Sequence, residues 1–272
     1  MKGIERFFDK AEKYELYRPA YTEESLMQIL DFCGVSPDDK IKVADIGSGT
    51  GKFTQLLLNK GFYVYAVEPN DHMRHIAERK FSDYDNFVSI CNTAENTNLN
   101  DNCISLITVA QAFHYFDLDE VKKEFMRILK PDGKVALLWN FRSRESEFIQ
   151  EYENIIYSLH SGNVKPTHAQ DNMTEEIFEK FFENYEIVNL SNSQEFGFED
   201  LWGRTLSNNH MPKENEPEYI KLYNSVSKIF DRYQENGKVL FPYRTQVVVG
   251  DFGDDRQIEC LKYNDVYTKR RK

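Results

Sequence analysis

Residues 43–51 read Val-Ala-Asp-Ile-Gly-Ser-Gly-Thr-Gly, and this stretch decides the fold. A short apolar run ends at Asp45 and Ile46, and glycines follow at alternate positions: Gly47, Gly49 and Gly51. Glycine allows a backbone turn where a side chain would clash, and it lets a ligand approach the backbone closely. The next residues, Phe-Thr-Gln-Leu-Leu-Leu at 53–58, are typical of the first turns of a helix. The stretch therefore predicts a strand, a tight turn and a helix N-terminus that form a socket for a nucleotide-like ligand.

The spacing of the glycines separates two classes of ligand. The dinucleotide fingerprint is G-x-G-x-x-G. Here the third glycine comes one residue early, and Lys52 occupies the position where that fingerprint has Gly or Ala. The spacing therefore disfavours an NAD(P)-linked oxidoreductase. A glycine turn alone is a weak signal, because it can also mark another ligand or tight packing.

Length and composition narrow the class of protein. The chain has 272 residues, enough for one large α/β domain with insertions or for two small domains, and its formal net charge is −11. Nucleic-acid binders usually carry a basic face, so the charge disfavours DNA or RNA as a partner. No apolar run approaches the length of a membrane span, and Met1-Lys2-Gly3-Ile4-Glu5 begins no signal peptide, so we expect a cytoplasmic protein without membrane contact.

The cysteines indicate neither a zinc site nor a disulfide framework, because they are scattered and form no Cys-x-x-Cys pair. They are Cys33, Cys91, Cys103 and Cys260. We therefore expect no bound metal.

Strand and helix patterns alternate with short links across about 100 residues, which is typical of a doubly wound parallel sheet. The predicted strands cover residues 41–46, 63–67, 87–91, 104–109 and 134–139. The predicted helices between them begin after Gly51 and cover 71–80 and 118–129, the last stopped by Pro131-Asp132-Gly133. In such a sheet the ligand binds at the carboxyl ends of the strands.

The flanks of this core are less regular. Helices are predicted at 4–16, 22–33, 146–159, 174–182 and 217–233, strands at 187–190 and 244–249, and loops at 160–172 and 207–217. No linker separates two domains. We therefore expect a single domain over 1–272, with a helical lid at 1–35, a cofactor-binding core at 36–140, substrate-side insertions at 141–240, and a final strand and tail at 241–272.

Polar and apolar side chains at the strand ends fit an adenosine. Glu68 closes the second strand, where a carboxylate can accept hydrogen bonds from both ribose hydroxyls. Met73, at the start of the next helix, would lie on the adenine face. Thr93 and the Ala94 amide, after the third strand, would read the adenine edge. The alternatives are a surface acid, a core methionine and an ordinary turn at the strand exit.

These pieces together resemble the class I S-adenosylmethionine-dependent methyltransferases of the methyltransferase type 11 group, over about residues 40–140. The resemblance runs through residues 45–51, 67–69, 93–95, 110–116 and 127–133. Residues 14–19, Tyr-Glu-Leu-Tyr-Arg-Pro, resemble the opening of a subset that includes small-molecule methyltransferases, some of which act on carboxylic acids such as trans-aconitate. The C-terminal half matches only in outline, at 201–207 and 241–245. One departure is Thr93, where many relatives carry an acid for the adenine amino group.

The resemblance implies a Rossmann-like fold with a seven-stranded, mostly parallel sheet, in which residues 243–252 supply an antiparallel last strand near the edge. It also implies S-adenosylmethionine as the cofactor and a small-molecule methyl acceptor. Ala110 and Gln111 open an aromatic segment at 110–116 that would surround the sulfonium. Tyr17 and Arg18 would fold over the ligand as a lid, and Asp45 would support its ammonium group. A hydrophobic strand-to-helix turn is the other interpretation of the aromatic segment.

His114 is the candidate for a catalytic base, needed only if the acceptor must lose a proton. A packed or surface histidine is the alternative. A set of arginines would hold a carboxylate through paired hydrogen bonds, unless they are unrelated surface residues. The set is Arg18, Arg142, Arg204 and Arg244. The competing functions are an NAD(P)-binding oxidoreductase, a non-catalytic S-adenosylmethionine-binding protein and a macromolecular methyltransferase, the last disfavoured by the acidic composition.

Overall fold

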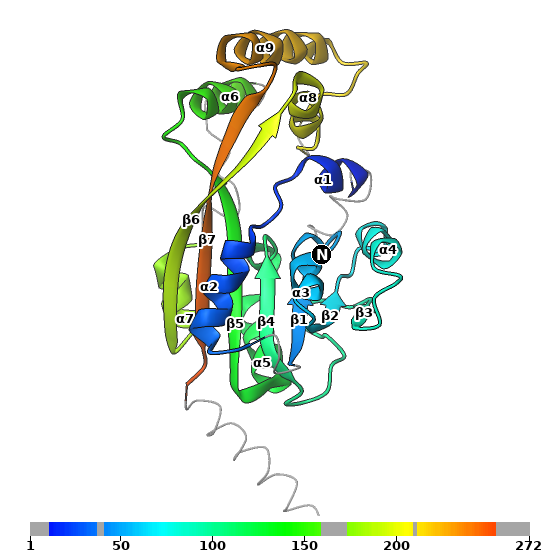
Figure 1. The fold of residues 1–272 in the computed structure, drawn as a ribbon, viewed down its shortest axis with the longest axis vertical. Helices are drawn as coiled ribbons and strands as arrows, with labels where there is room; N and C mark the ends of the chain where they lie inside the picture. The colour runs from blue at the N-terminus through cyan, green and yellow to red at the C-terminus, as the bar shows by residue number, and fades with distance from the viewer. Residues whose placement is uncertain (1–10, 37–40, 159–172, 209–210, 254–272) are drawn as a thin grey trace, which may run out of the picture.

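The computed structural model describes residues 11–36, 41–158, 173–208 and 211–253 (Figure 1). A seven-stranded sheet with the order β3-β2-β1-β4-β5-β7-β6 runs through it. Strands β1 to β5 are parallel to one another, and β7 is antiparallel to both β5 and β6. The strands are β1 (Lys42–Ile46), β2 (Tyr63–Val67), β3 (Phe87–Ile90), β4 (Ile104–Ala110), β5 (Leu129–Arg142), β6 (Asn184–Phe196) and β7 (Val239–Asp251). The expected sheet, with its antiparallel last strand inside the edge, is confirmed.

Helices pack on both faces of the sheet, as the doubly wound pattern predicts. They are α1 (Ala11–Tyr17), α2 (Glu23–Cys33), α3 (Lys52–Asn59), α4 (Asp71–Lys80), α5 (Leu118–Ile128), α6 (Glu147–Ser158), α7 (Glu175–Phe181), α8 (Phe198–Leu206) and α9 (Pro217–Tyr233), with a 3-10 turn η3 at Phe113–Tyr115. Side chains of Thr22, Asn70 and Asp117 cap three of these helices by accepting backbone N–H groups of the first turn. The caps fix where the chain leaves each strand-to-helix link.

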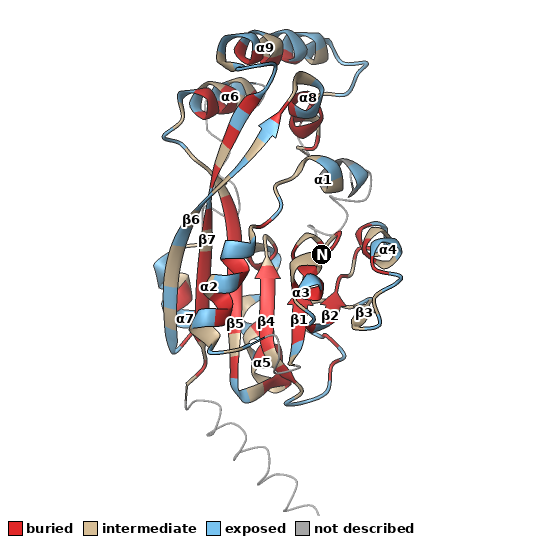
Figure 2. Cartoon of the chain, in the orientation of Figure 1, coloured by how far each residue is buried: buried red, intermediate tan, exposed pale blue. Residues whose placement is uncertain are grey.

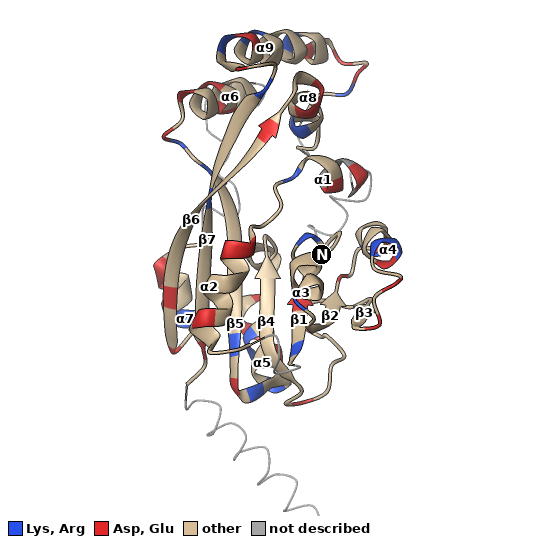
Figure 3. Cartoon of the chain, viewed as in Figure 1, with Lys and Arg blue, Asp and Glu red and all other residues tan. Residues whose placement is uncertain are grey.

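The sheet separates two apolar clusters. On one face α2 and α3 contribute Leu26, Ile29, Phe53 and Leu57, and on the other α5 and α7 contribute Val121, Phe125, Phe178 and Phe181. Figure 2 shows the central strands buried along most of their length. The central strand β4 is almost wholly apolar and carries no charged residue (Figure 3). A strand covered on both faces has this composition because neither side meets water.

The long strands carry a second body of structure, which we call the upper lobe. It consists of α6, α8, α9 and the ends of β6 and β7 where Phe196 pairs with Val239 (Figure 1). Strands β6 and β7 have 13 residues each and β1 has 5, so at about 3.3 Å per residue this antiparallel pair projects well beyond the core. Its own apolar cluster is centred on residues such as Ile149, Leu201, Val226 and Phe241.

The structure corrects the sequence-based boundaries in three places. Residues 131–133 were expected to separate a helix from a strand, but they belong to β5, which begins at Leu129 with a register shift against Ile104 and Leu106. Strand β6 is longer than the predicted 187–190, and α8 was not predicted. The other described helices and strands agree with their predicted ranges, with ends shifted by one or a few residues. Residues 4–10 and 160–172, predicted as helix and loop, lie outside the described residues.

Within the part of the chain that the structure describes, each helix is too short or too polar to cross a bilayer.

Candidate cofactor and methyl-transfer site

The glycine turn joins β1 to α3, and its three glycines meet different requirements. All three have positive φ: +67° at Gly47, +58° at Gly49 and +81° at Gly51. A Cβ at Gly47 would lie 2.5 Å from the Ala112 Cβ, and one at Gly51 would lie 2.3 Å from the Phe81 ring. At Gly49 the nearest neighbour would be the Met73 sulfur, at 3.7 Å. Tight packing therefore accounts for Gly47 and Gly51, and Gly49 leaves room above the turn.

Glu68 follows β2, beside the turn. One carboxylate oxygen accepts the Gly49 amide at 2.9 Å, and the other accepts the Asn70 amide at 2.8 Å. The side chain is 7% exposed. Burial raises the pKa of Glu68 above its ordinary value, against the effect of the two amide hydrogen bonds. Each carboxylate oxygen retains a further lone pair for a ligand hydroxyl.

Met73 lies at the beginning of α4, close to the turn. The Asn70 side chain caps this helix by accepting the Met73 amide at 3.1 Å. Met73 is 5% exposed, and its sulfur is the atom nearest to the open side of Gly49. The sequence-predicted pair Glu68 and Met73 therefore meets at one point of the turn.

Asp45 lies beneath the turn, at 0% exposure. Its carboxylate accepts the Thr54 hydroxyl at 2.5 Å and the Thr108 hydroxyl at 2.9 Å. Desolvation raises the pKa of Asp45 from 3.8 to about 6, although these hydrogen bonds act in the opposite direction. The contacts tie β1 to α3 and β4, so Asp45 braces the turn from below. Direct contact with an ammonium group stays a prediction.

Helix α1 lies over the turn and is attached to it through Glu15. The Glu15 carboxylate accepts the Thr50 hydroxyl at 2.5 Å, and it lies 2.9 Å from the Lys80 ammonium. The Lys52 ammonium donates to the Glu15 carbonyl and lies 3.7 Å from its carboxylate. Desolvation lowers the pKa of Lys52, which Glu15 partly offsets. Lys52, the residue that breaks the dinucleotide fingerprint, thus helps to hold α1.

The other side of α1 contacts the upper lobe. The Tyr17 ring fills the space that a side chain at Gly203 would occupy, because a Cβ there would lie 2.2 Å from the ring. The Arg18 guanidinium donates to the Ser207 carbonyl at 3.3 Å. Tyr17 and Arg18 therefore lie between the glycine turn and α8, and their role as a lid over a ligand stays a prediction.

The two remaining strand-end segments lie at the same edge of the sheet. Thr93 is half-buried and bridges to Asn96, and Ala94 is 4% exposed. Ala110 ends β4, and Gln111 follows with φ +59°, a strained conformation for a residue with a side chain. The Gln111 amide donates to the Leu138 carbonyl at 2.9 Å, which holds this strained residue against β5. Backbone strain of this kind concentrates at functional sites.

A polar joint at Asn140 was not recognised in the sequence. The Asn140 side-chain oxygen accepts from Thr245 at 2.5 Å and from Asn192 at 3.3 Å, and its backbone carbonyl accepts from Gln111 at 3.1 Å. Both asparagines donate to the Ala20 carbonyl, between α1 and α2. The joint connects β4, β5, β6, β7 and the lid. An asparagine that ends the apolar run of residues 135–139 was the available signal.

His114 lies in η3, half-buried. Its Nδ1 accepts the indole N–H of Trp139 at 3.4 Å, and its ring centroid is 4.1 Å from that of Tyr115. Tyr115 is 45% exposed, whereas Trp139 is fully buried. The aromatic segment is therefore partly core and partly surface at the edge of the site.

The four arginines do not face one point. Arg142 pairs with Glu153 at 3.1 Å, and the buried Arg204 donates to the Tyr243 hydroxyl at 3.3 Å. Arg244 is exposed and follows Tyr243 in β7, so its side chain points to the opposite face of the sheet. Arg18 and Arg204 share a neighbour in Ser207, whose hydroxyl donates to the Arg204 carbonyl.

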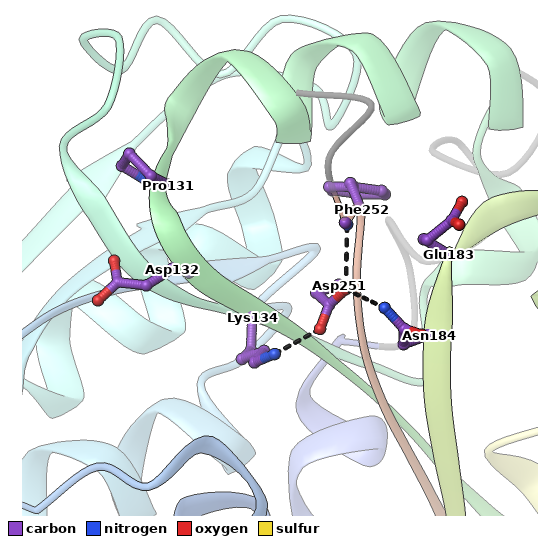
Figure 4. Close-up of a pocket in the computed structure, with 9 residues that line it drawn as sticks. Pro131, Asp132, Lys134, Glu183, Asn184, Asp251 and Phe252 are labelled. Carbon is purple, nitrogen blue, oxygen red and sulfur yellow. Dashed lines mark hydrogen bonds and ion pairs between the residues drawn. The ribbon is translucent and has the colours of Figure 1, made fainter. Parts of the chain in front are cut away.

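A separate pocket lies at the amino end of β5, away from the glycine turn (Figure 4). Lys134 and Asp251 pair across it, and Asn184 donates to Asp251 at 3.0 Å. Because β5 is parallel to β4 and β4 to β1, this pocket lies at the edge of the sheet opposite to the site.

Comparison with known proteins finds relatives for the part of the chain that holds the glycine turn. A family model described as a methyltransferase domain matches residues 44–137, which include the glycine turn, Glu68 and His114. An uncharacterized methyltransferase of Mycobacterium tuberculosis is 34% identical over 53% of this chain and 55% of its own length, so the chain spans about half of that relative. An uncharacterized methyltransferase of Schizosaccharomyces pombe is 27% identical over 84% of this chain and 89% of its own length.

The fold itself recurs in solved structures. A proposed type II methyltransferase of Anaeromyxobacter dehalogenans superposes with a TM-score of 0.62 and 16% identity, covering 86% of this chain and 98% of that one. At this identity the likeness is one of fold. The family match adds the residues of the turn and the strand ends. Residues 44–137 are therefore similar to a methyltransferase domain, and the sheet around them has the fold of a solved structure of that name.

Proposed function

We propose that this protein transfers the methyl group of S-adenosylmethionine to a small molecule at the carboxyl edge of the sheet, beneath α1. The observation that carries the proposal is the hydrogen bond from the Gly49 amide to Glu68, at 2.9 Å. It places a buried carboxylate beside the one glycine of the turn where an added Cβ would not clash with a neighbour. A ribose with two adjacent hydroxyls fits a carboxylate whose two oxygens each keep a lone pair for a further hydrogen bond.

The neighbouring residues supply the rest of an adenosine site. Glu68 would hold the ribose, Met73 would cover one face of the adenine, and Thr93 with the Ala94 amide would read its edge. Gly47, Gly49 and Gly51 bring the backbone close to the ligand, while Asp45 supports them from below. Ala110 and Gln111 would line the side nearest to the methyl group, and Tyr17 and Arg18 would close over it.

The cofactor supplies a methyl group that is already activated, because it is bound to a positively charged sulfur. The protein then has to align the acceptor and exclude water. Orientation of this kind is worth roughly 7–11 kcal/mol in well-aligned systems. Helix α1 contributes through contacts to both the turn and α8, so lid, core and upper lobe would act as one methyltransferase unit.

Two arginines between α1 and the upper lobe support an acceptor class. The upper lobe has an apolar core of its own and lies beyond the carboxyl ends of the parallel strands, where it would cover a small organic molecule bound there. Arg18, whose guanidinium donates to the Ser207 carbonyl, and Arg204, which lies one helical turn before Ser207, would hold a carboxylate. We infer a small carboxylic acid of the trans-aconitate type, in line with the resemblance of residues 14–19.

Calorimetric titration tests the cofactor. Wild-type protein should bind S-adenosylmethionine and S-adenosylhomocysteine, and NADH should give no heat of binding. Glu68→Ala should weaken the binding of S-adenosylmethionine and of S-adenosylhomocysteine by about 10- to 100-fold, which is the loss expected when hydrogen bonds to a charged group are removed. Glu24→Gln, an exposed acid of α2, is the matched control and should bind as wild type. Binding of NADH in preference to both sulfur ligands would overturn the assignment.

Methyl transfer needs a second experiment. A metabolite extract incubated with donor labelled in the methyl group should yield a labelled small molecule, and a panel of acidic and neutral metabolites should favour the acids. A protein that binds S-adenosylmethionine but labels nothing would be a binding protein on this scaffold. Equal labelling of acids and neutral compounds would refute the role of the arginines.

A further inference from the structure

In the contact between Trp139 and His114, Trp139 can act only as the hydrogen-bond donor. The indole N–H of Trp139 lies 3.4 Å from Nδ1 of His114, and Trp139 is fully buried. An indole nitrogen can only donate a hydrogen bond, and it usually finds an acceptor when buried. Nδ1 of His114 must therefore present its lone pair to Trp139.

This contact determines where a neutral His114 carries its proton. A neutral imidazole holds one proton, on one of its two nitrogens. Because Nδ1 is the acceptor, the proton lies on Nε2. Any group that meets Nε2 in this state meets a hydrogen-bond donor rather than a base.

The surrounding packing keeps the two rings in this relation. The Trp139 ring lies 6.2 Å from Phe113 in an edge arrangement and 5.8 Å from Phe178, both of which are buried. On the other side, the His114 ring lies against Tyr115. The buried rings therefore fix the indole N–H of Trp139, and rotation of the imidazole would break the hydrogen bond to it.

We propose that Trp139 is a positioning residue that fixes His114 in the Nε2–H form, so that His114 orients the methyl acceptor by donating a hydrogen bond to it. In this proposal His114 does not remove a proton from the methyl acceptor as a base; it donates a hydrogen bond to the acceptor instead. An acceptor that arrives as an anion, such as a carboxylate, needs no base and offers the oxygen lone pair that Nε2–H requires. The part about the acceptor rests on the proposed methyl transfer, and the proton position does not.

Nitrogen NMR measures the proton position directly, in the absence of any substrate. Long-range proton–nitrogen correlation spectra of ¹⁵N-labelled protein are recorded at about pH 8.5, where an ordinary histidine is neutral. Loss of one signal in His114→Gln identifies His114. We expect that signal to show protonated Nε2 and unprotonated Nδ1. Protonated Nδ1 in the wild type would overturn the proposal.

Variants at Trp139 test the cause. Trp139→Phe removes the N–H and retains an aromatic ring, so the single Nε2–H pattern should give way to a mixture of both forms. Trp202→Phe makes the same change in the upper lobe and should leave the His114 signal unaltered. A pure Nε2–H pattern in Trp139→Phe would show that Trp139 does not set it. If Trp139→Phe fails to fold, the wild-type spectrum still decides the proton position.

Activity separates a donor from a base, once an acceptor is known. His114→Gln retains an N–H donor, so it should keep within about tenfold of the wild-type kcat, whereas His114→Ala should lose about 10- to 100-fold. Equal loss in both variants would support a base and contradict the proposal. Absence of methyl transfer in the wild type would instead contradict the proposed function and leave the NMR result standing.

Discussion

Asp45 is buried beneath the turn, where ionisation of its carboxyl group is unfavourable. Its ionisation therefore lowers the stability of the folded protein. Its pKa of about 6 lies above the ordinary value of 3.8, since desolvation favours the protonated form in the folded state. Folded protein binds this proton more tightly than unfolded protein does. The contribution of Asp45 is then greatest below about pH 4 and is lost as pH rises through about 6.

Asp45→Asn tests this. The amide is almost the same size and carries no charge, so the variant should gain stability relative to wild type between pH 4 and pH 7, by an amount on the order of 3 kcal/mol. Urea unfolding at several pH values measures the difference, which isolates Asp45 from the other titrating groups. A difference that stays flat across this range would mean that Asp45 does not titrate there.

The residues that carry the turn were predictable because their constraint is local. Gly47, Gly49 and Gly51 need positive φ whatever surrounds them, and Glu68 is fixed by the end of β2. Asp45 was predicted to support the ligand's ammonium group, directly or through water, and only the fold revealed its hydrogen bonds to the Thr54 and Thr108 hydroxyls. Asn140 was missed for the same reason, because its partners are up to 120 residues away along the chain.

At the scale of elements, α1 is the part whose attachment is most specific. Glu15 holds it to the turn through exposed or half-buried ion pairs, which are worth little individually. Tyr17 holds it to α8 by close contact with Gly203. The steric contact at Gly203 therefore controls whether the lid stays on the upper lobe.

Gly203→Ala should release α1. Alanine in a helix normally stabilises it relative to glycine by about 0.5–1 kcal/mol, but here its Cβ would lie 2.2 Å from the Tyr17 ring. Hydrogen exchange should show lost protection confined to residues 11–17, with little change in the unfolding midpoint of the whole protein. Gly197→Ala, at the N-cap of α8, is the steric control because its Cβ would meet nothing closer than 3.8 Å. Wild-type protection of α1 in Gly203→Ala would rule out this attachment.

Elements with strong periodicity were predictable, and those that depend on distant pairing were not. The strands and helices from β1 to α4 follow the apolar pattern closely. Helix α8 and the full length of β6 were missed because β6 alternates polar and half-buried residues, and its extent is set by its pairing with β7. Register, rather than composition, determines such a strand.

At the scale of the whole molecule, the polar joint at Asn140 connects core, lid and upper lobe. Asn140→Leu would leave the fully buried Thr245 hydroxyl without this acceptor, and it would remove the hydrogen bond to the Ala20 carbonyl. We expect a loss of about 2–4 kcal/mol in the free energy of unfolding. Asn189→Leu, an exposed position of β6, should change it by less than about 0.5 kcal/mol. Comparable losses of stability in both variants would show that the hydrogen bonds of Asn140 do not stabilise the protein more than an exposed asparagine of β6 does.

Strand β7 lies between β5 and β6, although β6 precedes it in the chain. During synthesis one edge of β5 therefore stays unpaired while more than 90 further residues are added. It is paired only when the segment around Val247 emerges and binds beside Leu138. Such a late, long-range pairing slows folding and exposes an apolar strand in the meantime. A message with a premature stop just before Val239 would leave both long strands unpaired, and we expect its product to depend on chaperones or to aggregate rather than to fold as a smaller enzyme.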